Sequence, residues 1–216
     1  MRSRFDEQLA LLKKEMIEMG AMCEEAIALA ARALTEGNVT LAEKVAPLSQ
    51  NIDQMERDIE SRCLKLLLQQ QPVAKDLRVI SAALKMITDI ERIGDQAEDI
   101  TEILPYLSGR KLPDNIPVKE MAGGVIRMVT DSVDAYVKQD IDMAKSVINR
   151  DDVIDRYFAS IKLNLIDLLK KDTDSGEVAI DLLMIGKYLE RIGDHATNIA
   201  EWVIFSVTGT HKEVLT

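Results

Sequence analysis

Acidic side chains recur at every fourth residue in two segments of this chain, and this spacing is the feature that could support chemistry. The two series are Glu91, Asp95 and Asp99 in the first segment, and Glu190, Asp194 and Asn198 in the second. Residues four apart lie on one face of an α-helix, so each series would place its oxygen atoms in a row. Carboxylate and amide oxygens are ligands for Mg²⁺, Ca²⁺ and Mn²⁺. The spacing therefore indicates two candidate cation sites.

Further carboxylates precede each series at positions that a neighbouring helix could bring to it. Asp53 precedes the first series, and Asp151 and Asp155 precede the second. Ser49 stands at the position that matches Asp151, so one carboxylate is missing from the first set and we expect the second set to be the stronger. The predicted clusters are Asp53, Glu91, Asp95 and Asp99 in the first half, and Asp151, Asp155, Glu190, Asp194 and Asn198 in the second.

A solvated acidic helix face is the alternative explanation of these series. Like charges four apart on one helix cost only about 0.2–0.5 kcal/mol per pair. Carboxylates that face one another across two helices would repel more strongly, by roughly 3 kcal/mol at ~5 Å and an effective dielectric near 20. Gly94 and Gly193 lie between the acids, where a glycine costs roughly 1 kcal/mol relative to alanine. They permit close approach of either a ligand or a neighbouring helix, and both explanations stay open.

The sequence contains no pattern typical of an enzyme active site. A di-iron carboxylate bundle would need Glu-x-x-His on two helices. His195 instead follows Glu190 by five residues, and the first half has no histidine. We also find no nucleophile–base signature and no phosphate-binding glycine loop. We therefore predict that the chain is not an enzyme, and keep a metal-dependent carboxylate-bundle enzyme or a metal-storage protein as alternatives.

Apolar residues at alternating steps of three and four predict the helices that position these acids. A first helix runs from Phe5 to Ala33 and ends at Gly37, and a second could be capped by Thr40, with a late start or a kink at Pro47. A third carries Glu91 and ends near 107, and residues 109–117 form a linker. Three more helices follow, over 118–128, 143–168 and 182–203.

An internal repeat relates the two halves of the chain. Residues 91–102 match residues 190–201 at eight of twelve positions, an offset of 99, and Ile52-Asp53 matches Ile154-Asp155 at an offset of 102. Short loops between helices favour antiparallel neighbours. We therefore predict an all-α chain of two tandem antiparallel three-helix bundles, residues 1–108 and 118–208, related by an internal pseudo-twofold repeat.

Composition and charge narrow the possible partners. A net charge of −10 opposes binding to nucleic acid, whose phosphates require lysine and arginine. No apolar run approaches the roughly 18 residues that a membrane-spanning helix needs. Cys23 and Cys63 lie far apart, which fits a reducing compartment. We expect a soluble, cytoplasmic protein that forms homodimers through an apolar stripe left uncovered by its long helices.

Several segments resemble the PhoU family. They are Gln71-Pro72-Val73-Ala74-Lys75-Asp76-Leu77-Arg78, the two copies of Glu-Arg-Ile-Gly-Asp at 91–95 and 190–194, and Ala196-Thr197-Asn198-Ile199-Ala200-Glu201. The resemblance covers essentially the whole chain, including its duplication. The combination of the first motif with two copies of the second is specific to that family.

The resemblance implies a function that the spacing of residues does not. PhoU-like proteins are cytoplasmic negative regulators of phosphate uptake that connect the ATPase subunit of a phosphate ABC transporter with a sensor histidine kinase. The resemblance thus places the chain in the cytoplasm, recruited to the inner face of the membrane by these partners. Some members bind multinuclear iron or zinc through acidic motifs and others are metal-free. Ser49 departs from the acidic motif and removes one expected ligand.

Overall fold

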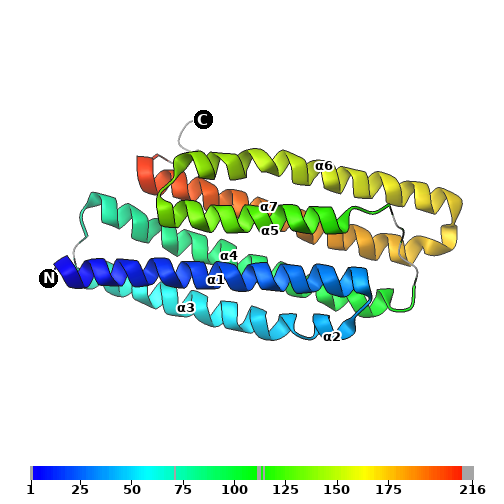
Figure 1. Ribbon diagram of the computed structural model, residues 1–216, viewed down its shortest axis with the longest axis horizontal. Helices are drawn as coiled ribbons and strands as arrows, with labels where there is room; N and C mark the ends of the chain where they lie inside the picture. The colour runs from blue at the N-terminus through cyan, green and yellow to red at the C-terminus, as the bar shows by residue number, and fades with distance from the viewer. Residues whose placement is uncertain (1, 71, 111–112, 114, 211–216) are drawn as a thin grey trace.

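The computed structural model of the chain describes residues 2–70, 72–110, 113 and 115–210, which form an elongated bundle of six long α-helices (Figure 1). These are α1 (Arg2–Glu36), α3 (Val45–Gln70), α4 (Ala74–Leu107), α5 (Val118–Lys138), α6 (Ile141–Lys171) and α7 (Gly176–Thr208). A short α2 (Val39–Ala42) and a 3₁₀ turn, η1 (Thr173–Ser175), connect neighbours. The described residues contain no β-strand, which confirms the predicted fold class.

The heptad pattern of the first segment becomes the buried stripe of α1. Leu12, Met16 and Met19 are fully buried, as are residues further along the same stripe. Gly37 ends the helix in a left-handed conformation with φ +64, which a residue without a Cβ adopts without strain. The sequence predicted this boundary correctly because both the apolar period and the terminating glycine are local signals.

The connection from α1 to α3 differs from the prediction in one respect. The Asn38 side chain, not that of Thr40, caps the short α2, because Asn38 Oδ1 accepts a hydrogen bond from the Thr40 backbone N–H at 3.1 Å. Helix α3 then begins late, at Val45, and Pro47 lies in its first turn. A proline is tolerated there because N–H groups of the first turn have no partner within the helix.

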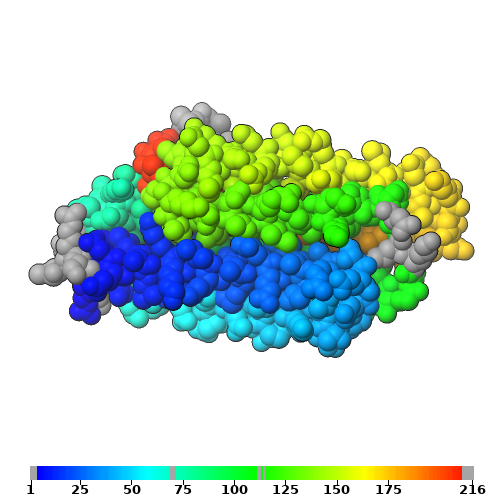
Figure 2. Space-filling model, in the orientation of Figure 1, coloured from blue at the N-terminus to red at the C-terminus, as the bar shows by residue number. Residues whose placement is uncertain are grey.

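Helices α1, α3 and α4 form one bundle, helices α5, α6 and α7 form the other, and the two share one hydrophobic core. Helix α4 lies antiparallel to α7, since α4 residues Arg78 and Asp89 bond to α7 residues Ser206 and His195 respectively. Helix α1 packs along α5, and Figure 2 shows these two helices in contact over much of their length. The buried Tyr136 hydroxyl also joins the halves by donating to the Val79 carbonyl at 3.1 Å.

Equivalent isoleucines cross equivalent glycines in the two halves. A Cβ added to Gly94 would lie 2.9 Å from Ile52 Cδ1, and one added to Gly193 would lie 3.4 Å from Ile154 Cγ2. Each glycine therefore allows the two helices to approach closely, so the packing explanation of these glycines holds. These crossings bring the acids of α3 towards α4, and those of α6 towards α7.

Candidate functional site

Three carboxylates converge in the first half. Asp53 on α3 and Glu91 and Asp95 on α4 each place one oxygen atom within 4.8 Å of the others. The residue before Asp53 is the isoleucine that packs on Gly94, so the helix crossing itself sets this separation. Among the described residues, these three form the one group of histidine, cysteine or acidic side chains with this geometry.

Burial and mutual charge act on the carboxylates of the first cluster. Burial, followed by the charge of Asp95, raises the pKa of Glu91. Burial and the charge of Asp53 raise the pKa of Asp95, while the Ser49 hydroxyl opposes that rise. Asp53 Oδ1 is buried and has no hydrogen-bond partner among the described residues. An orphaned acceptor beside two crowded carboxylates fits a hard divalent cation, for which these three residues would be the ligands.

The second cluster is assembled differently. Burial, then Asp194 and Asp155, raise the pKa of Asp151 to about 6, so these acids from α6 and α7 face one another. Burial and Glu190 raise the pKa of Asp194, and Lys187 opposes that rise. Within the described residues, however, no three of these oxygen atoms meet within 4.8 Å. The geometry therefore favours the first cluster over the second, the reverse of the order predicted from the sequence.

Asp99 and Asn198 lie apart from the convergent oxygens. The Asn198 side chain donates to Asp89 Oδ1 across the α4–α7 contact at 3.2 Å. Arg191 of α7 lies close enough to Asp99 to lower its pKa, although burial and Glu102 raise it on balance. Both residues thus face the junction between the halves. The residues of each series do lie along one side of their helix. The last residue of each, however, faces the contact between α4 and α7 and not the cluster with α3 or α6.

Sequence reasoning missed two residues that complete the surroundings of the clusters. Glu56 lies one helical turn after Asp53, and its charge raises the pKa of Glu91. Lys187 lies one turn before Glu190 and forms an ion pair with it. Both could have been found by asking which charged residues stand three positions from a predicted ligand, since such residues share a helix face.

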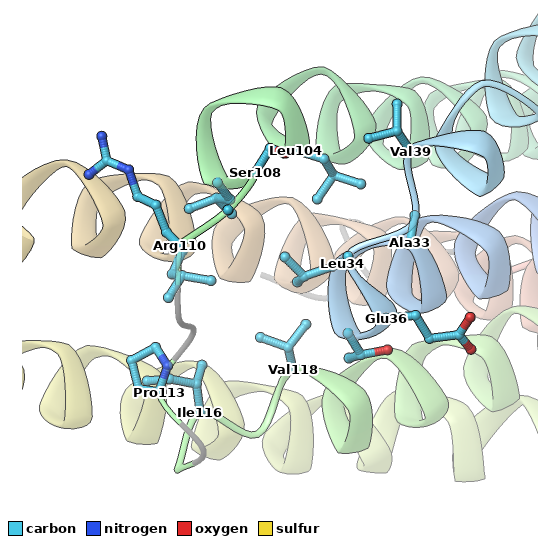
Figure 3. Close-up of a pocket in the computed structure, with 15 residues that line it drawn as sticks. Ala33, Leu34, Glu36, Val39, Leu104, Ser108, Arg110, Pro113, Ile116 and Val118 are labelled. Atoms are coloured by element: carbon cyan, nitrogen blue, oxygen red, sulfur yellow. The ribbon is translucent and has the colours of Figure 1, made fainter.

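A cavity lies away from both clusters. It has a volume of about 460 Å³ and is formed by the ends of α1 and α4 together with the start of α5. Figure 3 shows Leu34, Leu104 and Val118 around it, while the Arg110 guanidinium points away. Arg110 instead pairs with Glu177 at 2.6 Å. Residues 111, 112 and 114 of the predicted linker lie outside the described residues, as does Gln71 of the family motif.

The fold and the acidic clusters define a class of protein, the duplicated three-helix bundle with carboxylates on its inner helices. Comparison with known proteins identifies the family. The model of the PhoU domain matches residues 16–104 and again residues 118–203. The chain belongs to the PhoU family, and its two repeats are two copies of that domain. None of the helices in the described part of the chain has the length and apolarity that crossing a membrane requires.

Relatives match over nearly the whole chain. A protein of Clostridium acetobutylicum named "Phosphate-specific transport system accessory protein PhoU homolog" is 37% identical over 99% of this chain and 98% of its own length. Homolog 1 of Thermotoga maritima is 35% identical over 98% of this chain and 92% of its own length. The crystal structure of PhoU from Pseudomonas aeruginosa superposes with a TM-score of 0.90 at 33% identity, covering 95% of this chain and 100% of that one.

Proposed function

We propose that this chain is a negative regulator of phosphate uptake and of phosphate-starvation signalling. The observation that carries the proposal is the match of both repeats, and nearly the whole chain, to relatives named as accessory proteins of a phosphate-specific transport system. Regulation by contact also suits the molecule itself. Long helices with polar outer faces offer extended surfaces to partners.

The proposed partners are the ATPase subunit of a phosphate ABC transporter and a phosphate-sensing histidine kinase. The chain would work in the cytoplasm and reach the inner face of the membrane by binding them. With phosphate plentiful, the complex would keep the kinase from activating starvation genes. Co-purification of the tagged chain with each partner from cells grown in high phosphate tests the contacts directly.

Deleting the gene tests the function. We expect phosphate-starvation genes to be expressed in high phosphate without this chain, and to be repressed again when the wild-type gene is returned. Transcript levels of the transporter genes provide the measurement. Repression that persists in the deletion strain would count against the proposal.

Metal binding at the first cluster is a second proposed property, supported by the convergence of Asp53, Glu91 and Asp95. The oxygen donors suit Mg²⁺, Ca²⁺ or Mn²⁺, and family resemblance admits multinuclear iron or zinc. The ion would hold together acids on α3 and α4 that otherwise repel. A carboxylate-bundle enzyme or a metal-storage protein would instead show, respectively, an oxidase activity dependent on Glu91 or many ions per chain.

We also propose that the chain forms homodimers. Ile180, Leu183 and Met184 share one face of α7 and are respectively 63%, 36% and 41% exposed, so apolar surface is left uncovered there. Light scattering at micromolar concentration measures the mass directly. Finding monomers alone would remove this proposal without affecting the others.

A further inference from the structure

The two acidic clusters occupy equivalent places in the repeats but differ in the residues beside them. The shared frame is the pair of isoleucine–glycine crossings, Ile52 on Gly94 and Ile154 on Gly193. Counted from this frame, the position of Glu56 on α3 is taken by Phe158 on α6, at the offset of 102. At the offset of 99 that relates α4 to α7, Thr88 aligns with Lys187.

In the first half a hydrogen bond from an uncharged hydroxyl joins the two positions that differ between the repeats. Thr88 Oγ1 donates to Glu56 Oε1 at 3.3 Å. The glutamate adds a fourth negative charge beside Asp53, Glu91 and Asp95, and its charge raises the pKa of Glu91. A hydroxyl carries no charge to balance these acids. Three acids and one cation, Arg92, act on Glu91, so the first cluster keeps an excess of negative charge.

In the second half the same two positions hold a cation that belongs to the chain. Lys187 Nζ forms an ion pair with Glu190, whose side chain is 15% exposed. The same ammonium lies 5.6 Å from the centre of the Phe158 ring. A lysine over an aromatic face is held by the negative potential of the ring. Lys162 lies at an equal distance from that ring and adds a second positive charge nearby.

We propose that Lys187 is a built-in cation of the second repeat, and that divalent metal ions bind the first repeat alone. The lysine neutralises part of the charge that a metal would otherwise neutralise. It also repels an incoming ion and engages one oxygen of Glu190. The remaining acids do not bring three oxygens together, so this half does not fit a metal ion. The inference rests on the proposed metal binding at the first cluster, and it is independent of the phosphate-regulation assay.

Equilibrium dialysis of the full-length chain against Mn²⁺, followed by elemental analysis, tests the proposal with matched variants. Glu91→Gln and Glu190→Gln make the same change at equivalent positions of the two repeats. We expect Glu91→Gln to weaken Mn²⁺ binding at least about tenfold and Glu190→Gln to change it by less than about twofold. Broadening of amide signals by the paramagnetic ion should be confined to residues near Glu91. An equal loss in the two variants would overturn the proposal.

Replacing Lys187 and Phe158 by the residues at the equivalent positions of the first half tests for a gain of metal binding. Lys187→Thr combined with Phe158→Glu rebuilds the surroundings of the first cluster in the second half, and we expect the amount of bound Mn²⁺ to increase about twofold. Circular dichroism confirms that the double variant folds. A wild-type chain that binds no Mn²⁺ overturns the proposed metal binding at the first cluster, on which this inference rests. Absence of any gain in this folded variant overturns it.

Discussion

Gly94 and Gly193 show how much of the site depends on the absence of a single side chain. Ile52 and Ile154 pack directly on them, and each isoleucine is followed by an aspartate that faces the neighbouring helix. The close crossing thus positions the acids as well as the core. This explains why a residue that weakens a helix is retained in the middle of two long ones.

Replacing Gly94 by alanine should destabilise the fold. The new Cβ would lie 2.9 Å from Ile52 Cδ1 and 3.4 Å from its Cγ2, in a part of the core where Ile52 is fully buried. Overpacking of this kind costs about 1–3 kcal/mol, which exceeds the gain of about 1 kcal/mol in helix propensity. We expect a net loss of about 1 kcal/mol in the free energy of unfolding, measured by urea denaturation.

Two further variants control this experiment. Gly123→Ala places its Cβ 3.7 Å from the Arg127 guanidinium and should stabilise by about 0.5 kcal/mol. Adding Ile52→Val to Gly94→Ala removes the crowded Cδ1, so the two changes should be non-additive. If Gly94→Ala stabilised the protein, the crossing of α3 and α4 would have space for a Cβ at this position. The explanation of Gly94 by close packing against Ile52 would then be wrong.

Asp151 should make stability depend on pH. Its pKa of about 6, raised mainly by burial and then by Asp194, lies above the unfolded value of about 3.9. The folded state therefore binds more protons between these values, and stability falls as pH rises from about 4 to 6. Because the group is partly solvated and screened, we expect Asp151→Asn to add only about 1 kcal/mol at pH 7.

Thermal unfolding between pH 4 and 7 measures this effect, and Asp152→Asn is the matched control. Asp152 is exposed and adjacent, and its charge acts on Asp151 less than those of Asp194 and Asp155 do, so its removal changes the net charge equally with a smaller effect on the cluster. Asp151→Asn should reduce the change in thermal stability between pH 4 and 7, and Asp152→Asn should leave that change in place. An identical pH profile in the two variants would contradict the assignment of this titration to the cluster.

At the scale of helices, the sequence predicted elements better than contacts. Apolar periods and Gly37 are local signals, so the bounds of α1 could be predicted from sequence. The cap at Asn38 was missed because two capping residues stand near each other and only the backbone geometry chooses between them. The place of Asn198 was missed for a related reason. A spacing of four residues shows that side chains share one helix face. Which neighbouring helix each of those side chains contacts depends on how the helices pack, and the spacing does not show this.

The ion pair between α1 and α3 should stabilise the first bundle measurably. Arg62 binds Glu15 through two nitrogens, each 2.6 Å from a carboxylate oxygen, and a third nitrogen contacts Gln8 at 2.9 Å. Both charged side chains are largely buried, at 24% and 15% exposure. We expect Arg62→Ala to cost about 2 kcal/mol, because it leaves Glu15 without its partner. A double-mutant cycle with Glu15→Ala should give a coupling of about 1–2 kcal/mol.

An exposed ion pair within α1 serves as the comparison for this buried pair. Lys14 and Glu18 are 3.2 Å apart, but their side chains are 69% and 50% exposed. Lys14→Ala should therefore change the free energy of unfolding by less than about 0.5 kcal/mol. Equal costs for Lys14→Ala and Arg62→Ala would mean that the bidentate geometry adds nothing.

At the scale of the whole molecule, the duplicated halves depend on each other for their cores. Gly20 of α1 lies against Val133 of α5, where an added Cβ would come within 3.0 Å of Val133 Cγ2. Lys13 Nζ donates to the Val137 carbonyl at 2.9 Å, and α4 packs along α7. The two repeats therefore share one continuous core.

This continuity predicts that neither half folds alone. Separating residues 1–110 from 115–216 would expose the apolar faces of α1 and α4 that now contact α5 and α7. Large exposed apolar patches promote association. We expect each half alone to lack a cooperative thermal transition, and the mixed halves to regain one. Cleaving the intact protein within residues 109–117 should lower its Tm by less than about 10 °C, because the halves stay packed. Circular dichroism and size-exclusion chromatography measure both effects, and cooperative, monomeric unfolding of either isolated half would show that the repeats are independent domains.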